Sequence, residues 1–218
     1  MKKTIFAALV AVFCLAMVSC GESKTGMLKN HEWVDLGLPS GTKWASMNLG
    51  AEEASDWGDY LAWGESAGVL YGKKDFGWET YAYGKEDLLE KYNEADMQTV
   101  LSADDDIATR VWGKGWTVPT KEQIDELRTC CTWTWEGKGY EVKGISGATI
   151  FLPAAGYYRG TLLKSKKEEG GYWSSTRSAN NVKMALGLYL DEQSVSTEEC
   201  ERCLGQSIRP VCKVTSEN

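Results

Sequence analysis

The chain has 218 residues, a formal net charge of −7 and a single histidine, His31. This acidic balance argues against nucleic-acid binding, which depends on basic side chains that neutralise phosphates. A lone histidine also argues against a Ser/His/Asp triad or an ordinary catalytic zinc site.

Residues 1–19 are predicted to be a secretory signal. Lys2 and Lys3 precede an apolar run that is too short for an ordinary membrane-spanning helix. The run ends in "MVSC", which resembles a bacterial lipobox. This resemblance implies that Cys20 is lipidated and becomes the first mature residue. The alternative is a plain signal peptide in which the cysteine is coincidental.

The remaining chain is expected to form one domain. Residues 20–31 comprise the lipidated cysteine and a short tether, and residues 32–218 are long enough to bury a core of their own. We expect contact with the membrane through the lipid anchor alone.

The first half of the domain predicts short strands and long loops. Residues 33–50 are expected to form a hairpin that turns at Pro39-Ser40-Gly41. Residues 58–66 predict a short aromatic strand. Residues 69–96 are polar and broken by glycines, so we expect surface loops, with one possible helix at residues 85–93.

Three consecutive aspartates, Asp104 to Asp106, have two interpretations. Three carboxylates on a loop can bind Ca²⁺, but the EF-hand spacing is absent. They can also cap a helix that starts at Ile107 or accept internal hydrogen bonds. We favour the cap or the internal role and leave Ca²⁺ open.

The stretch "WGKGWTVPTKEQIDEL", residues 112–127, is a candidate phosphate loop that fails on spacing. It lacks the glycines of a Walker loop, and Val118 stands where a dinucleotide loop needs its third glycine. Thr120 and Gln123 instead form a capping box pattern. We therefore predict a glycine-kinked aromatic strand followed by a short amphipathic helix.

The second half of the domain is predicted to form mainly strands. Residues 131–144 predict a hairpin, residues 148–160 a central strand that ends near Gly156, residues 171–196 two or three strands, and residues 205–214 a last strand. The fold class is therefore α+β, mostly antiparallel, with one or two helices.

Apart from Cys14 and the lipidated Cys20, five cysteines remain: Cys130, Cys131, Cys200, Cys203 and Cys212. The pair Cys200 and Cys203 could be half of a zinc site or a redox pair, but no second CxxC motif accompanies it. In an exported protein a disulfide that includes one of these two cysteines is the favoured expectation.

Eight motifs occur in an order that resembles one family. They are "VDLGLPSGTKWASMNLGA", "YLAWGE", "TVLSADDDIA", "WGKGWTVPTKEQIDEL", "CTWTW", "IFLPAAGYYRG", "GYWSS" and "GQSIRPV". Together they resemble the Fibrobacter succinogenes major paralogous domain of Bacteroidetes lipoproteins. The resemblance covers residues 33–214. It implies a C-type-lectin-like fold related to formylglycine-generating enzymes, with a twisted antiparallel sheet and long loops on one exposed face.

The same resemblance implies a function and a surface. Relatives with a diversified binding face vary between the last two motifs, which corresponds to residues 176–204. We expect non-catalytic recognition of a protein or glycan, without a cofactor, by an outer-membrane lipoprotein that is exposed at the cell surface rather than in the periplasm. The candidate ligand-binding residues are Tyr157, Tyr158, Arg159, Trp173, Arg177, Asn180, Asn181, Tyr189, Asp191, Gln193, Glu198, Glu199, Glu201 and Arg202. Replacing Arg177 and Arg202 together with alanine is expected to weaken binding and leave folding intact.

Two other functions stay open. One is a structural envelope protein without a specific ligand. The other is a copper-dependent oxidase of the formylglycine-generating type that uses Cys200 and Cys203, although only two residues separate these cysteines where that family has four. A calcium-dependent lectin would be expected to carry "EPN" or "WND", and neither occurs.

Overall fold

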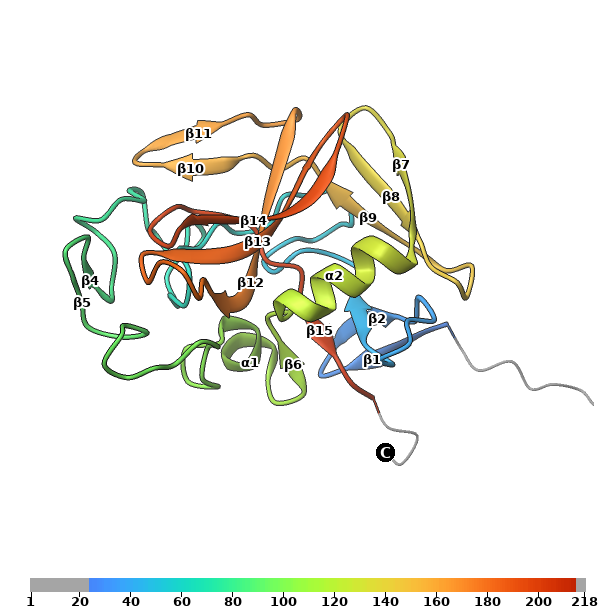
Figure 1. Ribbon diagram of the computed structural model, residues 1–218. Helices are drawn as coiled ribbons and strands as arrows, with labels where there is room; N and C mark the ends of the chain where they lie inside the picture. The colour runs from blue at the N-terminus through green and yellow to red at the C-terminus, as the bar shows by residue number, and fades with distance from the viewer. Residues whose placement is uncertain (1–23, 215–218) are drawn as a thin grey trace, which may run out of the picture.

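The computed structural model describes residues 24–214 (Figure 1), and within them it contains two short helices among strands. Every pairing between these strands is antiparallel. The expected α+β class with mostly antiparallel sheets is confirmed. No helix in this part of the chain is both long and apolar enough to cross a membrane.

The largest sheet joins the two ends of the described chain. Its first strand lies within residues 20–31, so the prediction that this segment is only a tether is wrong from Thr25 onward. The order of the sheet is β1-β2-β3-β15-β6, with β1 Thr25–Leu28, β2 His31–Val34, β3 Lys43–Ala45, β15 Val211–Cys212 and β6 Trp116–Thr117. The expected hairpin is present, because Val34 pairs with Trp44 across β2 and β3. Val211 then pairs with both Trp44 and Thr117, so the last strand lies between elements that are distant in sequence.

A second sheet has the order β7-β8-β9, with β7 Thr132–Trp135, β8 Gly139–Lys143 and β9 Thr149–Pro153. The predicted β7–β8 hairpin is confirmed. The prediction of a central strand is wrong, because β9 lies at an edge of this sheet. Its apolar side chains Ile150 and Leu152 are buried by packing against the core, and Pro153 fits an edge position.

The third sheet has the order β12-β13-β14 and consists of β12 Glu169–Arg177, β13 Met184–Asp191 and β14 Val195–Glu201. These three strands confirm the prediction for residues 171–196. Two small hairpins complete the fold: β4 Gly84–Lys85 with β5 Leu88–Leu89, and β10 Tyr157–Arg159 with β11 Leu162–Lys164.

The capping box predicts the start of α2 (Lys121–Cys130) correctly. Thr120 Oγ1 accepts from the Gln123 amide at 3.3 Å, and Gln123 Oε1 accepts from the Thr120 amide at 2.8 Å. The predicted aromatic strand before it is mostly wrong. Trp112 ends α1 (Ile107–Trp112), and Gly113 and Gly115 turn the chain at φ 92° and 110°, leaving only β6 as strand.

The possible helix at residues 85–93 is also wrong. The chain there forms the β4–β5 hairpin followed by turns. Tyr92 adopts φ 56° and is buried at 1% exposure, with its hydroxyl donating to Asp105. This long-range anchor prevents the regular helical backbone that the local charge pattern favours.

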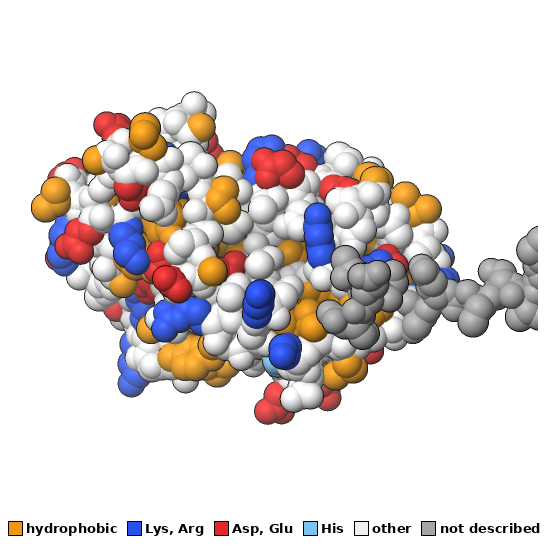
Figure 2. All heavy atoms as spheres, turned by 90° about the horizontal axis from the view of Figure 1, so that it is seen from below, with side chains coloured by type: hydrophobic (Ala, Val, Ile, Leu, Met, Phe, Trp, Pro, Cys, Tyr) orange, Lys and Arg blue, Asp and Glu red, His pale blue; other side chains and the backbone are white. Residues whose placement is uncertain are grey.

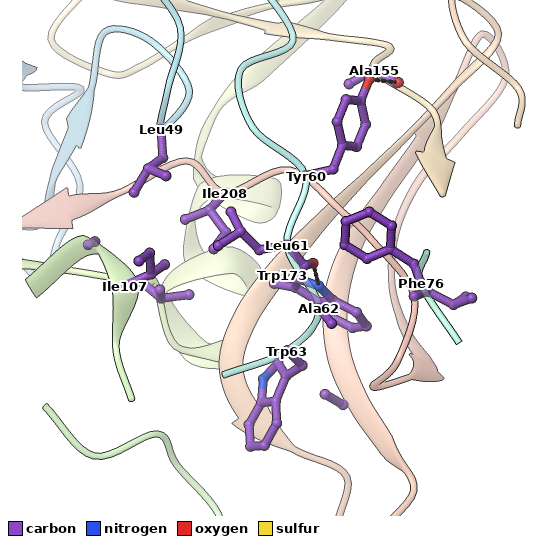
Figure 3. Packing of buried hydrophobic residues seen from close by; sticks show 14 of the residues in the cluster. Leu49, Tyr60, Leu61, Ala62, Trp63, Phe76, Ile107, Ala155, Trp173 and Ile208 are labelled. Atoms are coloured by element: carbon purple, nitrogen blue, oxygen red, sulfur yellow. Dashed lines mark hydrogen bonds between the residues drawn. The ribbon is translucent and has the colours of Figure 1, made fainter. Parts of the chain in front are cut away.

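The interior of residues 24–214 contains two hydrophobic clusters. The larger one contains Trp63, Phe76 and Trp173, and the smaller one packs α2 against β8, β9 and β13. Figure 3 shows how polar atoms of aromatic residues are satisfied inside the larger cluster. Trp173 Nε1 donates to the Leu61 carbonyl at 2.8 Å, and the Tyr60 hydroxyl donates to the Ala155 carbonyl at 2.5 Å. Trp173 and Tyr60 therefore fix distant segments to each other as well as filling volume.

Candidate functional site

A surface groove of about 540 Å³ lies where β13 begins and β14 ends. Met184 at the start of β13 pairs there with Glu201 at the end of β14. We call this groove the main groove. It is lined by Glu86, Arg159, Asn181, Lys183, Met184, Glu199, Cys200 and Glu201. Four of the predicted ligand-binding residues, Arg159, Asn181, Glu199 and Glu201, therefore meet here although they come from different segments.

Ion pairs border the main groove on two sides. Arg159 Nη1 lies 2.7 Å from Glu201 Oε2, and the indole of Trp78 donates to the other carboxylate oxygen at 3.4 Å. Lys183 Nζ lies 3.2 Å from Asp87 and 3.6 Å from Glu86. The hydrogen bond to Asp87 raises the pKa of Lys183, so this side chain stays charged at neutral pH.

Ser178 organises the wall that carries Asn181 and Glu199. This serine is fully buried, and its hydroxyl donates to Glu199 Oε1 at 2.7 Å while accepting from the amides of Asn180 and Asn181 at 3.0 Å. Asn181 Oδ1 accepts in turn from the Lys183 amide at 3.0 Å. Hydrogen bonds within the protein therefore position Asn181 and Glu199.

The other four lining residues, Glu86, Lys183, Met184 and Cys200, were not predicted as ligand contacts, although the sequence singled out Cys200 for possible metal or redox chemistry. The run Ser178-Ala179-Asn180-Asn181 is a local signal for the turn, because serine and asparagine side chains bond nearby amides. No local signal brings Glu86 to this place, since it arrives on the distant β4–β5 hairpin.

Three other predicted residues line a separate hollow of about 230 Å³ on the β13–β14 hairpin. They are Tyr189, Asp191 and Glu198. Asp191 accepts from the amides of Gln193 and Ser194 at 2.8 and 2.7 Å, and the Gln193 bond lowers its pKa most. Asp191 therefore stabilises the hairpin turn. Gln193 is exposed within that turn and lines neither hollow, and Asn180 is likewise exposed outside both.

The prediction that Arg202 belongs to an exposed binding surface is wrong, because its exposed fraction is 0%. Its guanidinium lies 4.7 Å from the ring centre of Trp63, 5.3 Å from that of Tyr81 and 5.8 Å from that of Tyr92. It donates to the Tyr81 hydroxyl at 3.0 Å and to the carbonyls of Tyr92, Val182 and Lys91 at 3.1, 2.9 and 3.1 Å. Arg202 is a structural cross-link between β14 and the loops before it.

Trp173 and Arg177 are also wrongly placed by the prediction. Trp173 is 1% exposed in the larger cluster, and Arg177 is 8% exposed. The Arg177 side chain donates to the Gln98 carbonyl at 3.0 Å and the Ser178 carbonyl at 2.9 Å. The combined Arg177 and Arg202 alanine variant should therefore unfold the domain, which corrects the expectation that it leaves folding intact.

The β10 strand contributes only one predicted residue to the main groove. The Tyr158 ring packs edge-on against Tyr60 at 4.9 Å and at a tilt against Phe76 at 5.4 Å, measured between ring centres. Tyr157 is half-buried against the larger cluster. Arg159 alone is exposed and lines the groove.

The five cysteines within residues 24–214 are all free thiols, so the expected disulfide is wrong for this part of the chain. Burial raises the pKa of Cys203 to about 12 and also raises the pKa of Cys200. Both thiols are therefore held in the protonated form, which is a weak nucleophile and a weak metal ligand. Their surroundings favour packing over redox chemistry.

Two of the three aspartates, Asp105 and Asp106, stabilise the fold internally, whereas Asp104 is exposed. Asp106 is the N-cap of α1 and accepts from the Thr109 amide at 2.9 Å, as the sequence predicts. Asp105 accepts from Lys91, Tyr83, Tyr92 and Ser102. Within residues 24–214, no three or more His, Cys, Asp or Glu side chains are arranged to hold a metal ion.

Replacing Asp105 with asparagine is expected to lower the free energy of unfolding by about 2 kcal/mol at pH 7, because charge-assisted hydrogen bonds are lost. Burial raises the pKa of Asp105, but the hydrogen bonds from Lys91, Tyr92 and Tyr83 lower this pKa by more than burial raises it. The pKa in the folded protein therefore lies below the ordinary value of 3.8. The contribution of Asp105 is therefore present above pH 3.8 and is lost as the pH falls through the folded pKa.

Urea unfolding of both proteins at pH 7 and near pH 3 measures this difference, and it should shrink at the lower pH. Asp104→Asn, in the exposed neighbouring carboxylate, is the matched control. Equal effects of the two substitutions at pH 7 would contradict the role given to Asp105.

Cys20, the predicted lipidation site, lies outside the described residues.

Comparison of the chain with protein-family models, curated proteins and solved structures gave no match.

Proposed function

We propose that this protein is a cell-envelope lipoprotein that binds a protein or glycan ligand in the main groove without transforming it. The family resemblance and the lipobox motivate the anchor at Cys20 and the C-type-lectin-like fold. One observation supports the site most strongly. Arg159, Asn181, Glu199 and Glu201, which were selected from the sequence as ligand contacts, line a single open groove.

The scaffold behind the groove favours recognition by a preformed surface. Glu199 is held by buried Ser178, and Glu201 is held by Arg159 and Trp78. Buried Arg202 follows Glu201 directly and fixes the end of β14 to the interior. A ligand that enters such a site need not order the side chains that bind it, which reduces the entropic cost of association.

The proposal is tested by binding the full chain, in mild detergent, to glycan and protein arrays and then comparing two variants on every ligand found. The groove variant carries Asn181→Ala, Glu199→Gln and Glu201→Gln. The control variant carries Glu136→Gln and Glu141→Gln, two exposed acids at the β7–β8 hairpin. It makes the same change in charge away from the groove.

We expect the groove variant to lose about tenfold or more in affinity, since a few central contacts carry most binding energy. The control variant should bind like the original chain, and both variants should unfold near the original temperature. Equal binding by all three proteins would refute the site. An original chain that binds nothing on either array would favour the structural envelope protein.

A further inference from the structure

A second hollow of about 320 Å³ adjoins the main groove. The two hollows share Glu86 and Lys183. We call their union the extended groove. Its second part is lined by Glu86, Asp87, Leu88, Leu89, Asn93, Glu94, Ala95, Val182 and Lys183. The β4–β5 hairpin lies at the left end of the molecule in Figure 1. The same end in Figure 2 shows acidic, basic and hydrophobic side chains interspersed.

The extended groove is lined by acidic side chains with apolar side chains between them. Its carboxylates are Glu86, Asp87, Glu94, Glu199 and Glu201, whereas its cations are only Arg159 and Lys183. Among residues 24–214, neither Glu94 nor Glu199 pairs with a lysine or arginine. Leu88, with 73% of its surface exposed, lies among these charges.

Lys183 stands at the junction of the two hollows and occupies a position that a ligand cation could take. Its partners Glu86 and Asp87 keep 55% and 95% of their side-chain surface exposed. Exposed ion pairs of this kind contribute little to stability, so they exchange readily. A cation from outside can therefore replace Lys183 beside these two carboxylates at small cost.

We infer that the occupant of the extended groove is a segment of a partner protein in which lysine or arginine side chains alternate with apolar ones. The inference rests on the proposed function, because it names the ligand class of the same site. A basic segment compensates the carboxylates that binding removes from water, and its apolar side chains cover Leu88, Val182 and Met184. A neutral glycan supplies no cation for Glu94 and Glu199, the two groove carboxylates without a lysine or arginine partner in residues 24–214.

The test uses three synthetic peptides of equal length, labelled with fluorescein, in which leucine alternates with lysine, serine or glutamate. Fluorescence anisotropy measures their binding to the full chain in mild detergent. The lysine peptide should bind most tightly. Lys183→Ala should tighten its binding about threefold, because an internal competitor for Glu86 and Asp87 is removed. Glu94→Gln with Glu199→Gln should weaken its binding about fivefold.

Matched controls separate the groove from the general charge of the chain. Lys143→Ala, on exposed β8, makes the same change in charge as Lys183→Ala. Glu136→Gln with Glu141→Gln matches the double acidic variant. Indistinguishable effects of a groove variant and its control would overturn the inference, as would tighter binding of the serine or glutamate peptide.

The outcomes also distinguish this inference from the proposed function. If the Asn181, Glu199 and Glu201 variant loses binding to an array glycan while the lysine peptide ignores every groove substitution, the peptide inference fails and recognition at the groove stands. If that variant keeps every ligand and the lysine peptide as well, both proposals fail.

Discussion

Replacing Arg202 with alanine is expected to lower the free energy of unfolding by about 4 kcal/mol. The substitution removes a guanidinium that lies among three aromatic rings and that donates to three backbone carbonyls. Those carbonyls lose their partner inside the protein, and the rings lose their packing against the cation. Thermal and urea unfolding of the purified protein measure the loss.

Two further variants make the Arg202 prediction specific. Arg202→Lys should remain destabilised, because one ammonium cannot reproduce the fork of donors that a guanidinium supplies. Arg110→Ala, in an exposed arginine of α1, should change stability by about 0.5 kcal/mol or less. An Arg202→Ala protein as stable as Arg110→Ala would show that Arg202 is not a structural cross-link.

Replacing Arg209 with alanine is expected to have a similar effect, again about 4 kcal/mol. Arg209 is 1% exposed and donates to Asn48 Oδ1 at 2.8 Å and to the Phe151 carbonyl at 2.7 Å. It also reaches the carbonyls of Ala45 and Ser46 at 3.2 Å. Burial lowers its pKa to about 10, which still leaves the side chain charged at neutral pH.

The consequence of losing Arg209 should be visible at particular places. β9 and the turn after β3 are held to each other through this side chain, so their amides should exchange with deuterium faster in the Arg209→Ala protein. Hydrogen exchange near Phe151 and Asn48, compared with that in β7, measures this. Uniform exchange throughout the domain, or no destabilisation, would contradict the proposed link.

Local signals in the sequence predict local structure well. The Thr120–Gln123 capping box fixes where α2 begins, and Asp106 caps α1, because each motif contains both the donor and the acceptor that it needs. The β7–β8 hairpin follows from alternating aromatics around a glycine turn. Such features depend on residues that are close together in the chain.

Features that depend on distant partners could not be predicted in this way. Residues 85–93 have the composition of a helix. The Tyr92 side chain is instead buried with its hydroxyl donating to Asp105, and the Tyr92 backbone adopts a non-helical φ of 56°. Arg177 and Arg202 look like surface charges, and only the folded structure supplies the carbonyls and rings that surround them. Charge alone does not distinguish a ligand contact from a buried cross-link.

The predicted binding segment therefore combines two kinds of residue. Arg177 and Arg202 point inward and hold the scaffold, whereas Asn181, Glu199 and Glu201 line the main groove. A substitution in the first group should be detected by unfolding, and one in the second group by ligand binding. The Arg202 variant tests the first group through stability, and the groove variant tests the second group through affinity for ligand.

The claim that this is a recognition protein displayed on the outer surface is tested most directly by protease shaving. Intact cells that produce the protein are treated with protease and blotted for the domain, and lysed cells serve as the control. We expect the signal to disappear in intact cells, as it does after lysis. Protection in intact cells, with loss only after lysis, would place the main groove inside the envelope and contradict display to an external ligand.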